Sequence, residues 1–392
     1  MASILQTKTR SWAEVEQMLA SGNVQGKLSK EDLPTPALCV DLDALEGNIA
    51  KMAAYARAQG RALRPHGKSH KCSAIARLTL AAGAVGACSA KLSEAEAFAA
   101  GGIESVLVTT PMVGRHRVER AVALATRLPG LILVVDHAGN ADDLNAAAAT
   151  AGVTLHVAID LNVTNRTGIA PGPEAIALAE HLTRLPHLSF QGIQAYAGHT
   201  AHVVGFAERT TASQQAMAPA IATRRALEAR GIPCPWLSGA STGTYNIDGA
   251  MDGVTELQPG SYLFMDLDYN RIGGQSGPVY DDFANSLTVL STVYSMPGRE
   301  QAILDAGLKA FATDTPYPPL VRGLPGAVYS FAGDEHARLD VRRATLPVTL
   351  GDRLELVIPH CDPTVNLYNR FFATRGEQVE ALWRIDARGM ST

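Results

Sequence analysis

Short apolar runs alternate with helical patterns from residue 37 to about residue 258, and this alternation constrains the fold more than any other feature. The expected strands are 37–40, 62–63, 84–88, 105–109, 131–135, 154–160, 188–196, 235–239 and 254–258. Strands that alternate with helices form parallel sheets, and roughly eight such units are what a closed barrel requires. The pattern therefore predicts a (β/α)8 TIM-type barrel. An open doubly wound sheet is the alternative, but no GxGxxG motif follows the first strand.

The alternation stops after about residue 285. Later runs such as 354–358 and 381–385 are typical of strands, with turns and no helical patterns between them. We therefore expect a barrel over residues 31–280 and a second, mainly β domain over 281–392. Trp12, Val15, Met18 and Leu19 have helical spacing, so residues 1–30 are expected to form a segment that packs on the β domain.

The composition favours small-molecule chemistry in the cytoplasm. The net charge is −4 and no long basic run is present, so neither nucleic acid nor an anionic membrane is an expected partner. The five cysteines are scattered without a CxxC pair, which is typical of a reducing compartment and not of a disulfide framework or a thiolate zinc site. The N-terminus lacks the basic and apolar regions of a signal peptide, and no apolar run approaches the length of a membrane span.

Lys68 stands among basic residues in the stretch 64–71, Arg-Pro-His-Gly-Lys-Ser-His-Lys, directly after a predicted strand. Lysine acts as a covalent catalyst when its ammonium form is destabilised by burial or by neighbouring positive charge. Arg64, His66, His70 and Lys71 are expected to supply that charge to Lys68. The alternative is a solvated basic loop with no chemical role.

Further candidates follow later strands, where a barrel places its catalytic groups. Arg166 follows strand 154–160, Tyr196 ends strand 188–196, and Ser/Thr/Gly loops occur at 241–244 and 260–261. Each alone is more typical of a surface ion pair, ordinary packing or a turn. Together they match the needs of pyridoxal phosphate, which are a lysine anchor, a partner for the ring and a cradle for the phosphate.

Six motifs, taken together, resemble the family of D-threonine aldolases, 3-hydroxy-D-aspartate aldolases and D-serine dehydratases. They are the runs at 64–72, 35–43, 256–262, 304–309 and 334–336, and His-Cys-Asp-Pro-Thr at 360–364. These enzymes use pyridoxal 5'-phosphate and have the alanine racemase fold, so the resemblance implies a barrel followed by a β domain.

The resemblance also implies roles for individual residues. Lys68 would carry the cofactor, with Arg166 and Tyr196 at its ring, and the residues that hold its phosphate would be Thr242, Gly243, Thr244, Gly260 and Ser261. His202 matches a histidine that lies near the substrate hydroxyl in the aldolases. The chain departs from the family at Ala197, where related aldolases often have histidine.

His360 and Asp362 match the metal ligands of the family. In an extended segment, residues two positions apart point to the same side, whereas Cys361 would point away. At the corresponding positions the dehydratases of this family have a His-x-Cys motif, whose thiolate suits zinc. The nitrogen and hard oxygen of His-x-Asp suit manganese or magnesium better than zinc. Outside this family, a core histidine beside a turn aspartate would be the simpler interpretation.

The resemblance favours a carbon–carbon lyase that cleaves D-threonine or 3-hydroxy-D-aspartate to glycine and an aldehyde. The alternative is a D-serine or 3-hydroxy-D-aspartate dehydratase, which would yield an oxo acid and ammonia. A racemase would leave the metal pair without a role, and a non-catalytic pyridoxal phosphate carrier would not need the second domain. By analogy, we expect a homodimer.

Overall fold

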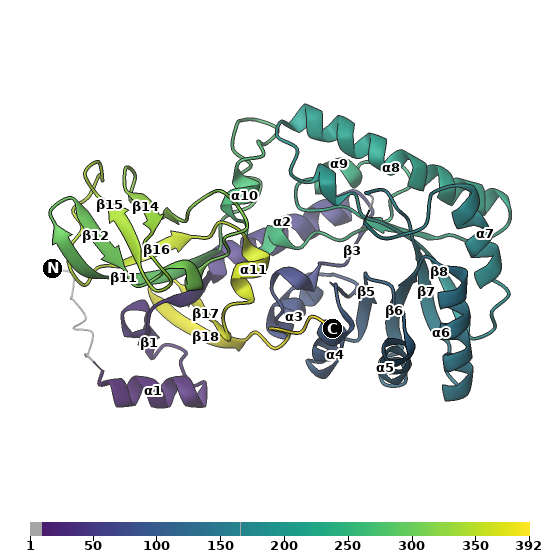
Figure 1. The fold of residues 1–392 in the computed structure, drawn as a ribbon, viewed down its shortest axis with the longest axis horizontal. Helices are drawn as coiled ribbons and strands as arrows, with labels where there is room; N and C mark the ends of the chain where they lie inside the picture. The colour runs from purple at the N-terminus through teal and green to yellow at the C-terminus, as the bar shows by residue number, and fades with distance from the viewer. Residues whose placement is uncertain (1–9, 165) are drawn as a thin grey trace.

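The computed structural model describes residues 10–164 and 166–392, which form two sheets with helices around one of them (Figure 1). The first sheet has eight strands in the order β3-β10-β9-β8-β7-β6-β5-β4, and all of its pairings are parallel. Its strands are β3 (Ala62–Leu63), β4 (Ala87–Ser89), β5 (Ser105–Val108), β6 (Gly130–Val135), β7 (Leu155–Asp160), β8 (Leu188–Ala195), β9 (Trp236–Gly239) and β10 (Glu256–Leu257). The parallel β/α architecture predicted from the sequence is confirmed.

The helices of this domain lie outside the curled sheet. They are α2 (Leu42–Ala58), α3 (Ser73–Ala81), α4 (Leu92–Ala100), α5 (Arg115–Ala125), α6 (Ala138–Ala151), α7 (Pro173–Leu182) and α8 (Phe206–Ala229), with short helices α9 (Tyr245–Asp248) and α10 (Leu267–Asn270). Within the described part of the chain, no helix is both long and apolar enough to span a bilayer.

The two edges of the parallel sheet meet beside the lysine stretch. The Val85 N–H donates to the Leu63 carbonyl at 2.8 Å, and the Cys88 N–H donates to the Pro65 carbonyl at 2.9 Å. A parallel bridge between His66 and Cys88 continues this contact. The chain that follows β3 is therefore held against β4, which fixes the position of the 3-10 turn η2 (Gly67–Ser69) that carries Lys68.

The second sheet has ten strands, mostly antiparallel, and forms the separate mainly β domain that the sequence predicts. Its strands are β1 (Leu28–Ser29), β2 (Ala37–Asp41), β11 (Leu287–Gly298), β12 (Gln301–Leu304), β13 (Leu320–Val321), β14 (Val328–Phe331), β15 (Ala337–Asp340), β16 (Arg353–Val357), β17 (Arg370–Arg375) and β18 (Gln378–Arg384). A short helix, α11 (Cys361–Val365), lies between β16 and β17 and faces the parallel sheet.

One strand was assigned to the wrong sheet by the sequence pattern. The run 37–40 begins the β/α alternation, but β2 pairs antiparallel with β11 and parallel with β17 in the β domain. Its residues are almost fully buried, so their apolar character suits either sheet. Periodicity alone cannot distinguish the two, because strands covered on both faces have the same sequence pattern in both settings.

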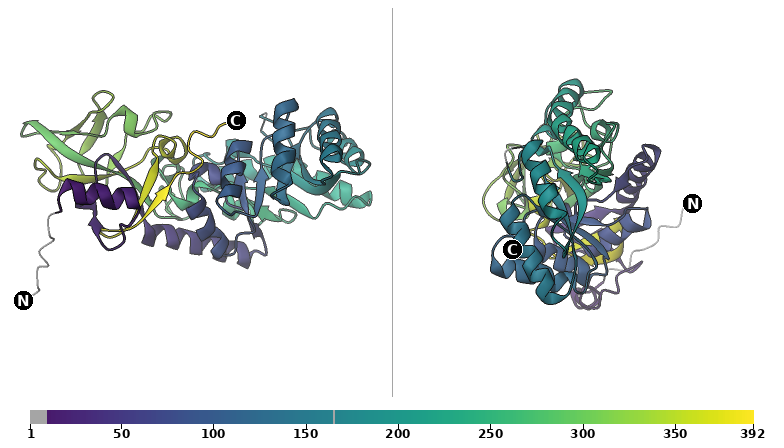
Figure 2. Two further views of the ribbon diagram at one scale, coloured as in Figure 1. Left: turned by 90° about the horizontal axis from the view of Figure 1, so that it is seen from below. Right: turned by 90° about the vertical axis from the view of Figure 1, so that its right-hand side faces the viewer.

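Both termini of the described chain contact parts that are distant in sequence (Figure 2). Helix α1 (Trp12–Ser21) places Val15 in a buried cluster with Leu28, Leu290 and Phe372 of the β domain, whereas residues 1–9 lie outside the described part. At the other end, Asp386 accepts a hydrogen bond from the Ser73 N–H at 3.0 Å. The tail that follows β18 therefore anchors the first turn of α3, directly after the lysine stretch.

Gly67 allows the closest packing in this region. A Cβ atom there would lie 2.3 Å from Cζ of Phe98, which is fully buried, and 3.1 Å from the Cys88 carbonyl oxygen. We expect Gly67→Ala to lower the free energy of unfolding by about 1–3 kcal/mol, the usual cost of overpacking a core. Phe98→Leu in the same chain should recover part of this loss. Denaturant titration measures both effects.

Gly47 provides the matched control. It lies in α2, and a Cβ atom there would meet nothing within 4 Å. Gly47→Ala should leave stability unchanged or raise it slightly, since alanine is the better helix former. A similar loss in both variants would contradict the steric explanation.

Candidate active site

A pocket of about 230 Å³ lies at the C-terminal ends of the parallel strands. Its lining comes from the end of β8 and from the segments that follow β3, β4, β5, β7, β8 and β10, and it consists of His66, Lys68, Ala90, Thr109, Thr110, Arg166, Thr167, Gln194, Tyr196 and Gln258. Lys68, Arg166 and Tyr196, which the sequence singled out separately, therefore share one cavity. The Arg166 guanidinium lies over the Tyr196 ring at 5.2 Å from its centroid.

The expected cluster of positive charge around Lys68 is absent from the described structure, because each basic neighbour is neutral or has its own partner. The buried Arg64 guanidinium donates from Nε to both carboxylate oxygens of Glu256 at 3.1 Å. Lys71 forms a buried ion pair with Glu94. Buried cations need such partners, since unpaired burial is costly. Arg64 and Lys71 therefore stabilise the surrounding fold and do not place an unpaired positive charge beside Lys68.

The two histidines of the stretch are uncharged near neutral pH. Burial is the main cause that lowers the pKa of His66 well below its usual value, and the nearby Lys68 ammonium adds to it. Burial likewise lowers the pKa of His70 to about 4. The prediction that these side chains destabilise the ammonium form of Lys68 through their charge is therefore wrong.

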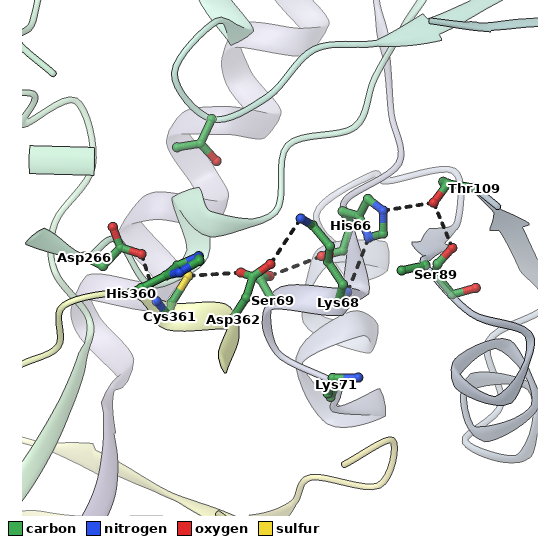
Figure 3. A network of polar contacts seen from close by, with 12 residues as sticks. His66, Lys68, Ser69, Lys71, Ser89, Thr109, Asp266, His360, Cys361 and Asp362 are labelled. Carbon is green, nitrogen blue, oxygen red and sulfur yellow. Dashed lines mark hydrogen bonds and ion pairs between the residues drawn. The ribbon is translucent and has the colours of Figure 1, made fainter. Parts of the chain in front are cut away.

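Lys68 instead faces a carboxylate from the β domain (Figure 3). Its Nζ lies 3.2 Å from Oδ2 of Asp362, and attraction to this group raises the pKa of Lys68 above its ordinary value. Burial alone would raise the pKa of Asp362, but Lys68 and His360 lower it to about 2. Asp362 is thus ionised near neutral pH, and it neutralises the charge of Lys68.

The segment that carries the predicted metal ligands is not extended, contrary to expectation. His360 has an extended backbone, but it is the N-cap of α11, so Asp362 lies in the first helical turn. Cys361 does not point away from Asp362, because its Sγ lies 3.3 Å from Asp362 Oδ1. Pro363 is compatible with this conformation, since a proline in the first turn of a helix removes no intrahelical hydrogen bond.

Two aspartates that sequence reasoning missed hold this segment in place. The Cys361 N–H donates to Oδ2 of Asp266 at 2.8 Å, and His360 Nδ1 lies 2.7 Å from Oδ2 of Asp314. Asp266 also accepts the Tyr269 N–H and so ties α10 to α11. Neither aspartate has a motif around it, and only their partners in space reveal their roles. Nowhere in the described residues do three or more His, Cys, Asp or Glu side chains gather as a metal-binding group.

The two Ser/Thr/Gly loops contact each other after β9 and β10. The Tyr262 N–H donates to Oγ1 of Thr242 at 2.9 Å, next to Gly260 and Ser261. A Cβ atom at Gly243 would lie 2.1 Å from the Ala201 carbonyl oxygen, so only glycine permits this backbone approach. A Cβ atom at Gly260 would lie 2.7 Å from the His66 carbonyl oxygen, which brings this loop against the lysine stretch.

Thr244 shapes the first of these loops from within. Its hydroxyl accepts the Ser241 N–H at 3.1 Å and donates to Oδ2 of Asp248 at 2.6 Å. Asp248 also accepts from the Ser213 hydroxyl of α8 at 2.5 Å. The loop is thus fixed to two helices through a buried carboxyl group.

His202 lies on the segment between β8 and α8. Its Nδ1 is 2.9 Å from Oδ2 of Asp268, and its ring packs on Tyr269 with 4.5 Å between centroids. The adjacent His202 side chain is the main cause that lowers the pKa of Asp268 to about 2. With Nδ1 directed to this carboxylate, Nε2 is the ring nitrogen left to exchange a proton with a bound molecule.

The buried Asp248 should make stability fall as pH rises. Burial raises its pKa to about 6 from the ordinary value of 3.8. Between these values the unfolded chain has lost the proton that the folded protein still holds, so stability decreases with pH, by on the order of 3 kcal/mol over the window. Asp248→Asn should remove this dependence, and unfolding titrations of both proteins from pH 4 to 7 would measure it. If the stability of both proteins fell equally with rising pH, Asp248 would not be the group responsible.

The sequence matches two family models, which divide the chain near the boundary between its two sheets. Residues 40–268 match the alanine racemase N-terminal domain, and residues 286–374 match the putative serine dehydratase domain. The solved D-threonine aldolase from Filomicrobium marinum is 38% identical, with a TM-score of 0.88 over 93% of this chain and 98% of that one.

Curated relatives cover nearly the whole chain. The 3-hydroxy-D-aspartate aldolase of Paracoccus denitrificans (strain Pd 1222) is 37% identical over 92% of this chain and 94% of its own length. The D-threonine aldolase of an Arthrobacter species is 38% identical over 91% and 93%. The D-threo-3-hydroxyaspartate dehydratase of Delftia sp. (strain HT23) is 32% identical over 90% and 97%. The chain therefore belongs to the alanine racemase-fold family that comprises the D-threonine aldolases, the 3-hydroxy-D-aspartate aldolases and the related dehydratases.

Proposed function

We propose that the protein is a pyridoxal phosphate- and divalent metal-dependent aldolase, which cleaves D-β-hydroxy-α-amino acids to glycine and an aldehyde. The observation that carries this proposal is the 3.2 Å contact between Lys68 Nζ and Asp362 Oδ2. It brings the candidate cofactor lysine and a candidate metal ligand to one place. The printed activities of two relatives, a D-threonine aldolase and a 3-hydroxy-D-aspartate aldolase, support the substrate class.

The pocket residues fit pyridoxal phosphate. Lys68 provides the amine, and the Arg166 and Tyr196 pair provides a cationic and an aromatic surface for a ring. Thr242, Gly243, Thr244, Gly260 and Ser261 form adjoining loops whose glycines leave no room for a side chain. When bound, the cofactor supplies an electron sink for the carbanion left at Cα.

The donor types of His360 and Asp362 fit a hard divalent ion, and manganese or magnesium suits them better than zinc. His360 Nδ1 is directed to Asp314, which is how proteins usually orient a ligating histidine so that Nε2 faces the metal. His360 and Asp362 are the side chains that would hold the ion. When bound, the metal supplies a Lewis acid at the substrate β-hydroxyl.

Individual side chains can be assigned roles in a retro-aldol cleavage. Lys68 would hold the cofactor until the substrate amine takes its place. His202, oriented by Asp268, can accept the β-hydroxyl proton at Nε2. Loss of that proton drives Cα–Cβ cleavage, which releases the aldehyde, and the carbon left at Cα takes up a proton to give glycine.

A dehydratase is the second candidate, and the Delftia relative is the observation in its favour. In that reaction Lys68 would remove the α-proton, and the metal would assist the departure of hydroxide. Asp362 favours the aldolase, because the motif of the dehydratase branch, His-x-Cys, has a cysteine at this position.

Product analysis separates the two candidates. With D-threonine, the aldolase should release glycine and acetaldehyde in equal amounts, and with 3-hydroxy-D-aspartate it should release glycine and glyoxylate. Lys68→Ala should abolish the absorbance of the lysine-bound cofactor and lower turnover by about a thousandfold or more, as expected for loss of a covalent catalytic group. Release of ammonia without glycine would rule the aldolase out.

The metal pair has its own test. Asp362→Ala should retain cofactor absorbance but lose activity, since the remaining histidine cannot hold a divalent ion alone. Asp314→Asn should be milder and lower metal affinity by roughly 10–100-fold, the usual cost of losing a group that orients a ligand. Metal titration of the cofactor-loaded proteins measures both. Normal turnover by Asp362→Ala after chelation would refute the metal role.

A further inference from the structure

We propose that Arg209 is a positioning residue for the cofactor phosphate, because its buried guanidinium holds the Gly243 carbonyl and, together with Tyr280 on the Thr242 carbonyl, fixes the loop whose Gly243 N–H is left for the phosphate. This inference rests on the proposed function and assigns a role to a residue that lies outside the pocket lining. Arg209 is in the first turn of α8 and is fully buried.

The guanidinium of Arg209 binds four backbone carbonyls on three loops. Nε donates to Gly243 at 2.8 Å, Nη1 to Val203 and Ile272 at 2.9 Å each, and Nη2 to Gly273 at 2.8 Å. The three loops are the candidate phosphate loop, the segment that carries His202, and the segment after α10. One side chain therefore fixes their relative positions.

The phosphate loop is held from behind at two successive carbonyls. The Tyr280 hydroxyl donates to the Thr242 carbonyl at 2.5 Å, and Arg209 takes the Gly243 carbonyl. In a planar trans peptide unit, the C=O and N–H point in opposite directions. The N–H groups of Gly243 and Thr244 consequently point away from Arg209 and Tyr280. Thr244 N–H closes the turn onto the Ser241 carbonyl, and Gly243 N–H forms no hydrogen bond with any described residue.

The charge of Arg209 is also uncompensated at close range. Within residues 10–164 and 166–392, no carboxylate forms an ion pair with it; the rings of Phe206 and Tyr280 lie over the guanidinium, and Asp282 acts on its charge only from a greater distance. A buried cation without an anion is unusual for a residue that merely joins loops, because its burial costs free energy that an apolar side chain would not. A dianionic group bound in front of Gly243 would supply the missing opposite charge.

The test compares pyridoxal phosphate with pyridoxal, which has the same aldehyde but no phosphate. We expect Arg209→Met to weaken pyridoxal phosphate binding to the cofactor-free protein by roughly 10-fold or more, the effect of losing a charge-assisted contact. Its affinity for pyridoxal should change less than about twofold, because Lys68 is untouched. Arg209→Lys keeps the charge but cannot reach all four carbonyls, so it should recover part of the preference. It is also the variant to measure if Arg209→Met does not fold.

Arg224 provides the matched control on the same helix. It likewise donates to two carbonyls, of Cys234 at 2.8 Å and of Gly253 at 2.6 Å, but it does not contact the phosphate loop. Arg224→Met should lower the melting temperature without changing the ratio of the two affinities.

Two results for Arg209→Met would overturn the role of Arg209 but not the proposed function. They are an equal loss of affinity for pyridoxal phosphate and for pyridoxal, or no loss of either. A wild-type protein that binds pyridoxal phosphate no more tightly than pyridoxal would instead overturn the proposed phosphate loop, and the inference with it.

Discussion

The contact between Lys68 and Asp362 is the interaction on which the candidate site depends. It joins a turn of the parallel sheet to a short helix of the β domain, so neither domain alone could form the site. Hydrogen bonds to the backbone fix both ends of this contact. The bridge between His66 and Cys88 holds the lysine turn, and Asp266 holds the Cys361 N–H. Lys68 and Asp362 neutralise each other's charge in this arrangement. Each side chain can still exchange this partner for a ligand of its own.

Paired charges explain how such a basic stretch can be buried beside Lys68. Arg64 and Lys71 each form an ion pair with a buried glutamate, and both histidines are neutral. A cation that is buried and paired stabilises the scaffold without imposing its full charge on its neighbours. The electrostatic setting of Lys68 is therefore governed by one carboxylate from the other domain.

The candidate phosphate loop shows the same dependence on tertiary contacts, here through backbone carbonyls. Tyr280 and Arg209 hold two successive carbonyls, and Asp248 holds the Thr244 hydroxyl. None of these three residues lies within the loop sequence at 241–244. The loop composition allows a close backbone approach, but the buried donors and acceptors behind it decide which way its peptide groups face.

The sequence by itself determined the repeated β/α units, the change to a β domain and the family, because each depends on local periodicity or on motifs written in consecutive residues. It also identified Lys68, Arg166 and Tyr196, which the structure brings into one pocket. The tertiary structure alone decided that β2 joins the β domain, since a fully buried strand has the same pattern in either sheet. It also decided the charge around Lys68 and the conformation of the segment from His360 to Asp362. Partners such as Glu256, Asp266 and Arg209 lie far away in sequence, and pairing across such distances leaves no periodic trace. Which groups are charged, and where they point, therefore emerges only when the chain has folded.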